Sequence, residues 1–201
     1  MVFFIGLGAA TLIRKSLLIT SKDIPVSVQT TVSRGIIMGL LSNHEAIVWG
    51  EFQKGKSTSE IAYGHRAMGW TPSYASRVLN RAREKIAGAL RGHAESHRLD
   101  VESLQDYKGL LIGFDYQANS QVYMVYTGAL GVVVWYVHSS YAGKLCPECP
   151  KEEECREALD AVLMEYGLEL RPDEEALPMT RQSTAIFHKL AAKEAPRYRR
   201  K

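Results

Sequence analysis

Three helix starts follow one another between residues 42 and 72, and they constrain the fold more than any other feature of this sequence. The segments Ser42–Glu45 and Ser57–Glu60 each place a glutamate three residues after a serine, which is the pattern of a capping box. Thr71 precedes Pro72, as an N-cap residue precedes a proline at the first helical position. The sequence therefore predicts three consecutive helices that begin at these positions.

Glycines and apolar spacing set the expected lengths of these helices. Gly55 is suited to end the first helix, and Gly69 the second. The third helix is predicted to run from Pro72 to about Arg91, because apolar residues recur there every three or four positions. These residues are Ala75, Val78, Leu79, Ala82, Ile86, Ala89 and Leu90.

Beyond residue 108 the apolar period changes from that of a helix to that of strands. Runs of β-branched and aromatic residues at 110–114, 121–126 and 132–137 predict a three-stranded antiparallel sheet. A helix is predicted over 152–166 with Gly167 at its end, then a short strand over 168–170 and a last helix capped by Thr180. The expected fold class is α+β: an N-terminal tri-helical helix-turn-helix followed by a small antiparallel sheet packed with two helices.

The same patterns divide the chain into segments. Residues 38–92 are the predicted helical domain, 93–108 a polar linker with a short helix after Asp100, and 109–195 an α+β domain for dimerisation or sensing. Residues 196–201 are a basic tail. Residues 1–37 have no clear amphipathic period, and we expect either that they are a dispensable extension or that Met38 is the real start.

Charge is unevenly distributed although the formal net charge is only +3. Residues 42–91 hold eight lysines and arginines against four acidic residues, whereas residues 151–175 hold ten acidic residues against three basic ones. This asymmetry suggests different partners for the two parts, although an acidic segment is more often a solvated face. No nucleophilic or acid–base constellation and no glycine-rich phosphate loop is recognisable, so we do not expect an enzyme.

The helical segment resembles a known pattern over about fifty residues. The runs that carry the resemblance are Ser57-Thr58-Ser59-Glu60-Ile61-Ala62, Gly69-Trp70-Thr71-Pro72-Ser73 and Leu79-Asn80-Arg81-Ala82-Arg83-Glu84-Lys85-Ile86. They are similar to the helix-turn-helix of LuxR-type regulators and sigma-factor region 4, and archaeal Tfx-like regulators share the same general logic. Residues 63–70 separate Glu60-Ile61-Ala62 from the N-cap Thr71, and the family usually has about three fewer residues in this segment. Three residues are close to one helical turn, so we expect the second helix to be longer here.

The resemblance implies that double-stranded DNA is the partner and that the third helix lies in the major groove. Arginine can pair with guanine and asparagine with adenine, and a helix N-terminus suits a phosphate. The expected contacts on the third helix are Thr71, Ser73, Tyr74, Ser76, Arg77, Asn80 and Arg81. The expected phosphate contacts are Lys54, Lys56, Arg66, Arg83 and Lys85. The alternative is that all of these are ordinary solvated residues of an interaction domain.

Cys146, Cys149 and Cys155 have the spacing C-x2-C-x5-C. Thiolates two residues apart can hold zinc, which is the candidate cofactor, and His138 is the candidate fourth ligand. A disulfide and reduced cysteines that help to start a helix are the alternatives. Three clustered cysteines do not form a secreted disulfide framework, so a cytoplasmic location is expected.

The sequence therefore predicts a sequence-specific DNA-binding transcription regulator. A homodimer is expected because one recognition helix reads only a few base pairs, and a small-molecule effector is a candidate partner of the C-terminal domain. The first alternative is a protein-interaction adaptor of the transcription machinery, and the second is an enzyme with an accessory helical domain.

The apolar run 1–13 is shorter than the ~18 residues of a bilayer span, so no membrane association is expected. Four aromatic residues of the strands could pack in the hydrophobic core or line a ligand pocket, and we expect the core: Tyr123, Tyr126, Trp135 and Tyr136.

Overall fold

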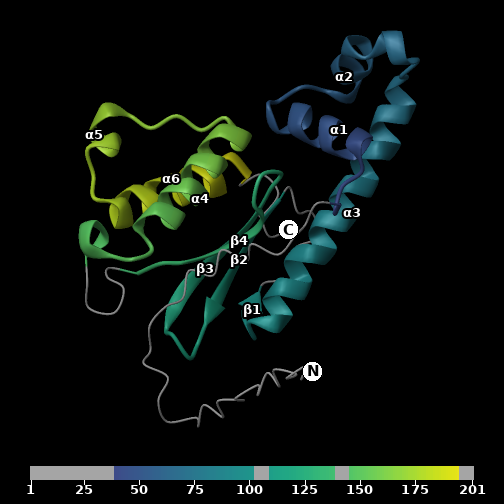
Figure 1. The fold of residues 1–201 in the computed structure, drawn as a ribbon. Helices are drawn as coiled ribbons and strands as arrows, with labels where there is room; N and C mark the ends of the chain where they lie inside the picture. Colours follow the sequence, from purple (N-terminus) through teal and green to yellow (C-terminus); the bar gives the residue numbers. More distant parts are fainter. Residues whose placement is uncertain (1–38, 102–108, 139–144, 195–201) are drawn as a thin grey trace, which may run out of the picture.

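The structure is a computed structural model that describes residues 39–101, 109–138 and 145–194 (Figure 1). The predicted extension 1–37, residues 102–108 of the predicted linker and the basic tail 196–201 lie outside the described residues. The fold class is α+β, as predicted: an N-terminal group of helices precedes a four-stranded antiparallel sheet and further helices. No helix in the described ranges combines the length and the apolarity needed to cross a membrane.

The three predicted helix starts are confirmed. The helices are α1 (Asn43–Gln53), α2 (Thr58–Gly64) and α3 (Pro72–Ser96). The carboxylate of Glu45 accepts the backbone N–H of Ser42 at 2.8 Å, and the carboxylate of Glu60 accepts that of Ser57 at 2.7 Å. Both serine hydroxyls accept the glutamate N–H in return, which completes two capping boxes. These local hydrogen bonds explain why the sequence alone located the helix starts.

The expected lengthening of the second helix is wrong. The α-helix ends at Gly64, and the additional residues form a short 3-10 helix, η1 (Arg66–Met68). Gly69 follows with φ +72°, a left-handed conformation that glycine adopts without steric cost. The turn places Trp70 in the core, 7% exposed, with its ring centroid 4.6 Å from that of His65. The extra residues therefore bury an indole instead of continuing the helix.

The segment predicted as a linker is partly regular structure. α3 continues to Ser96, because Ala94 extends the buried stripe beyond Leu90. Most of the short helix predicted after Asp100 lies outside the described residues; Val101, where it would begin, instead forms strand β1 (Asp100–Val101), which pairs with Phe114 and Gly113. The chain thus passes from α3 into the edge of the sheet within a few residues.

The three predicted strands form an antiparallel meander, as expected, and β1 adds a fourth strand to give the order β1-β2-β3-β4. The strands are β2 (Leu110–Asp115), β3 (Ser120–Thr127) and β4 (Gly131–Tyr136). Asp115 stabilises the β2–β3 turn by accepting the N–H groups of Gln117 and Ala118. Asn119 takes φ +47° in the same turn.

Both faces of the sheet are covered, which makes three layers (Figure 1). Met124 and Val134 point to the side of α3, whereas Tyr123 and Trp135 point to the side of α4 and α6. Tyr123 stacks on Phe187 with ring centroids 4.8 Å apart. The aromatic strand residues are therefore buried core, as expected, and the sheet packs against α3 in addition to the two predicted C-terminal helices.

The C-terminal helices are α4 (Glu152–Tyr166), α5 (Pro172–Glu175) and α6 (Met179–Glu194), and a 3-10 helix, η2 (Cys146–Glu148), precedes them. Gly167 ends α4 with φ +56°, as predicted. The predicted strand over 168–170 is wrong, because these residues have no ladder partner and connect α4 to α5. Thr180 lies inside α6 and is not its cap, since the carbonyl of Pro178 accepts the N–H groups of Arg181 and Gln182.

Candidate nucleic-acid interface

The first half of α3 has one buried face and one exposed face. Ala75, Val78 and Leu79 are at most 3% exposed and pack against α1 and α2. This part of the helix projects beyond the sheet, on the opposite side from α4 and α6 (Figure 1). The outward face of the helix is therefore accessible to a large partner.

Arg77, Asn80 and Arg81 are exposed on this outward face, as predicted. Their side chains have no hydrogen bond or ion pair with any residue in the described ranges. Arg77 and Arg81 are one turn apart, so their guanidinium groups project in the same general direction. Glu84 is exposed one turn further along and interrupts the row of cations on this face.

The start of α3 is organised by its cap. The hydroxyl of Thr71 accepts the N–H of Tyr74 at 3.2 Å, and the residue itself is exposed. Ser73 is exposed in the first turn, and Ser76 is half-buried. Ser73 therefore remains an accessible hydroxyl at the helix N-terminus, while that of Thr71 already caps the helix.

Tyr74 does not lie on the exposed face as expected. It is half-buried, and its hydroxyl is hydrogen-bonded to Nδ1 of His44 at 2.6 Å. Its ring also contacts Trp70, with centroids 5.5 Å apart. This cluster of aromatic rings and an imidazole joins α1 to the start of α3 and was not predicted from the sequence. Tyr74 therefore helps to position α3 and is less suited to contact DNA.

Of the predicted phosphate contacts, two remain available as cations. Lys54 at the end of α1 and Arg66 in η1 are exposed, and neither forms an ion pair with another described residue. Lys56 is paired instead with Glu51, with Nζ 3.0 Å from Oε2. The hydrogen bond from Lys56 is the main cause that lowers the pKa of Glu51, and a further bond from His65 adds to it.

Arg83 and Lys85 are held by contacts with α1. The guanidinium carbon of Arg83 lies 4.7 Å from the centre of the Phe52 ring, and its Nε is buried without a hydrogen-bond partner among the described residues. Lys85 donates to Oε2 of Glu45 at 2.7 Å. Both cations join α3 to α1, so the structure does not present them as uncommitted phosphate contacts.

The predicted metal ligands border one small cavity of about 10 Å³. Cys146, Cys149, Cys155 and His138 all line it, and none of the cysteines forms a disulfide. Nδ1 of His138 donates to the carbonyl of Tyr136 at 2.9 Å, which leaves Nε2 as the imidazole acceptor. Nevertheless, no three His, Cys, Asp or Glu side chains among the described residues are arranged to hold one metal ion. The fold thus gathers the donors without assembling a coordination sphere.

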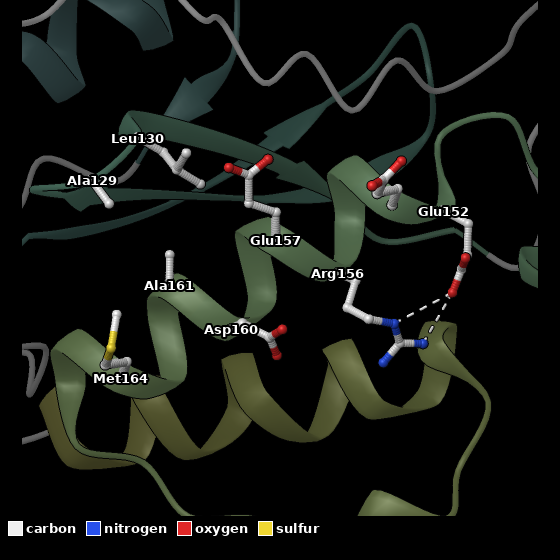
Figure 2. Close-up of a pocket in the computed structure, with 9 residues that line it drawn as sticks. Ala129, Leu130, Glu152, Arg156, Glu157, Asp160, Ala161 and Met164 are labelled. Carbon is white, nitrogen blue, oxygen red and sulfur yellow. Dashed lines mark hydrogen bonds and ion pairs between the residues drawn. The ribbon is translucent and has the colours of Figure 1, made fainter.

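A larger hollow of about 780 Å³ lies between α4 and the β3–β4 turn. Figure 2 shows Glu157 and Asp160 on α4 at this hollow, with Ala129 and Leu130 opposite. Arg156 is paired with Glu152, Nη2 to Oε1 3.1 Å, so its charge is largely compensated. Because this side of α4 is acidic, it is unsuited to contact phosphates, so the candidate surface for nucleic acid is limited to α1, α2, η1 and α3.

Comparison of the chain with protein families, with curated proteins and with solved structures found no match in any of the three.

Proposed function

We propose that the chain is a sequence-specific DNA-binding transcription regulator that places α3 in the major groove. The observation that carries this proposal is the outward face of α3, where Arg77, Asn80 and Arg81 are exposed and have no partner within the described ranges. Guanidinium groups suit the acceptor edge of guanine, and the amide of asparagine suits adenine. Lys54 and Arg66 supply two further cations for phosphates on the same helical domain.

A second candidate function, a protein-interaction adaptor, is favoured by two exposed apolar side chains. Tyr63 is 78% exposed and Met68 is 53% exposed, and both lie between the start of α2 and the end of η1. Aromatic residues and methionine are enriched at protein interfaces. An adaptor would use this patch and would be insensitive to the loss of Arg77 or Arg81.

A selection of bound fragments from genomic DNA, repeated at two salt concentrations, tests the proposal. We expect an enriched sequence, and weaker binding at the higher salt concentration because phosphate contacts release counterions. On the enriched site, Arg77→Ala, Asn80→Ala and Arg81→Ala should each weaken binding by about 1–3 kcal/mol and relax the preference at one position.

Arg181→Ala is the matched control, because Arg181 is exposed on α6, away from the helical domain. It removes the same charge and should leave the affinity within about twofold of the unmodified chain, as expected for a site that makes no phosphate contact. Unchanged binding of the α3 variants, together with a loss of partner binding on Tyr63→Ser or Met68→Ser, would favour the adaptor instead.

We also propose that the regulator is a cytoplasmic homodimer, because a single recognition helix reads only a few base pairs and a two-fold dimer matches a palindromic site. Sedimentation analysis of the full chain tests the dimer, and half-site spacing in the selected DNA tests its symmetry. A monomer that protects a single half-site would contradict it.

A further inference from the structure

A third cavity, of about 320 Å³, lies where α1 meets the sheet and the end of α4. Three elements line it: α1 contributes Trp49 and Gly50, β3 contributes Tyr126, and the end of α4 contributes Met164 and Glu165. Small-molecule sites are commonly cavities of this size at the junction of two structural units. Its position links the proposed DNA-binding helices to the sheet and α4.

Trp49 is a buried residue of this lining. The side chain is only 3% exposed, and its indole Nε1 is buried without a hydrogen-bond acceptor among the described residues. Because Nε1 has less than 1 Å² of accessible surface, a ligand in the cavity meets the indole as an apolar wall and not as a hydrogen-bond donor.

The cavity also has a cation and an anion in its lining. Lys54, at the end of α1, has no carboxylate partner within the described part of the chain. Glu165 accepts the N–H groups of Gly128 at 2.7 Å and Ala129 at 3.1 Å. Burial raises the pKa of Glu165, and the two N–H groups offset this only in part. A cationic group on a ligand would compensate for the hydration that this carboxylate has lost.

We infer that this cavity binds an α-amino acid with an apolar side chain. The ligand side chain packs on Trp49, Tyr126 and Met164, which form the apolar walls. The ligand carboxylate pairs with Lys54, and the ligand ammonium group pairs with Glu165, because these two residues are the charged part of the lining. Opposite charges in one apolar cavity select a zwitterion over a simple acid or amine.

Occupancy of the cavity is coupled to DNA through Lys54, a consequence that rests on the proposed function. Lys54 is also one of the two uncommitted phosphate contacts, so pairing with a ligand carboxylate withdraws it from DNA. The amino acid therefore lowers the affinity for DNA, and DNA lowers the affinity for the amino acid by the same factor.

Binding is measured on the full chain without DNA, with L-leucine, L-methionine and L-phenylalanine as probes. The chain has three tryptophans, so the indole N–H signals in a ¹H–¹⁵N NMR spectrum can be assigned with Trp49→Phe. We expect a saturable shift of the Trp49 signal with at least one probe, while Trp70 and Trp135 serve as internal references. Phenethylamine, which lacks the carboxylate, and N-acetylphenylalanine, which lacks the ammonium group, should bind at least tenfold more weakly than phenylalanine. The inference is overturned if no probe shifts the Trp49 signal, or if the two analogues bind as well as the amino acid.

Gly50→Leu provides a cavity-filling variant that keeps the fold. A Cβ at Gly50 would meet no atom within 4 Å, so a larger side chain has room to enter the cavity. Gly92→Leu on α3 is the matched control, because its Cβ also meets no atom within 4 Å and it lies outside the cavity. We expect Gly50→Leu to abolish the ligand-induced shift without lowering the melting temperature, and Gly92→Leu to retain it. Ligand binding by Gly50→Leu equal to that of the unmodified chain would contradict the site.

The two proposals can fail separately. A chain that binds the amino acid but no DNA keeps the inferred site and removes the proposed function. A chain that binds DNA but none of the probes keeps the proposed function and removes the inferred site. If both bind and the amino acid leaves DNA affinity unchanged, the site stands and its coupling through Lys54 is wrong.

Discussion

The ammonium group of Lys85 on α3 lies 2.7 Å from Oε2 of Glu45 on α1. The two residues are 40 positions apart in the sequence. Glu45 is almost completely buried and also closes the capping box by accepting the N–H of Ser42. A residue that the sequence suggested as a phosphate contact therefore fastens the proposed recognition helix to the helix that supports it.

Replacement of Lys85 by methionine should lower stability by about 1–2 kcal/mol, because it leaves a buried carboxylate with one charged partner fewer. The loss should be smaller than for a fully buried pair, since the side chain of Lys85 is 44% exposed. Urea denaturation of Lys85→Met, Glu45→Gln and the double variant gives the coupling between the two residues. A coupling free energy near zero would show that the contact contributes nothing.

The same pair predicts a pH dependence. Burial by itself raises the pKa of Glu45, but hydrogen bonds from Lys85 and Ser42 outweigh burial and lower the pKa below its ordinary value of 4.5. A carboxyl with a lowered folded-state pKa stabilises the protein above its unfolded value and loses that contribution as the pH falls through the folded value. The stability difference between the unmodified chain and Lys85→Met should therefore be full at neutral pH and shrink below pH 4.5. A difference that stays constant into acid would contradict this assignment.

Gly109 should tolerate no side chain. It has φ +87°, and an added Cβ would lie 2.1 Å from the hydroxyl of Tyr166 and 2.8 Å from Cζ2 of Trp49. Gly55 is the matched control, because it has φ +90° but open space around the Cβ position. Alanine at Gly55 should cost about 1–2 kcal/mol for the left-handed backbone. Alanine at Gly109 should cost about 1–3 kcal/mol more because of overpacking, as thermal denaturation would show. Equal losses for the two variants would mean that the core around Tyr166 adapts.

Local chemistry explains what the sequence predicted well. The capping boxes at Ser42 and Ser57, the cap at Thr71 and the glycine after α4 act within a few residues, so their patterns are visible in the sequence. The three strands of the meander were predicted for the same reason, since β-branched and aromatic residues are concentrated in them.

Contacts between distant segments explain what was missed. β1 has only two residues and exists because Asp100 and Val101 meet β2. The ring contact of Arg83 with Phe52 and the cavity beside Trp49 depend on packing between elements, which no local pattern encodes. One signal was available: the almost uninterrupted apolar runs of β3 and β4 indicate a sheet buried on both faces, as the structure shows.

The three cysteines differ in accessibility, which makes their state measurable. Cys146 and Cys149 are partly exposed, whereas Cys155 is buried. If all three are reduced, DTNB should react quickly with two thiols in the native chain and with the third only on unfolding. Bound zinc would instead protect the cysteines until a chelator is added, and a disulfide would leave a single reactive thiol. Because no three of the described donors are arranged around one ion, we expect the first result and no effect of EDTA on the melting temperature.

The salt dependence of DNA binding should separate the two kinds of cation in the helical domain. Each phosphate contact contributes about 0.9 to the slope of log K against log salt. Lys54→Met and Arg66→Met should therefore each reduce the slope by about 0.9, because these residues are exposed and have no ion-pair partner in the described ranges. Arg83→Met should leave the slope unchanged, since its guanidinium lies over Phe52. Fluorescence anisotropy titrations on the selected site at several salt concentrations would measure the slopes. A reduced slope for Arg83→Met with an unchanged slope for Lys54→Met would place DNA on a different side of the helical domain.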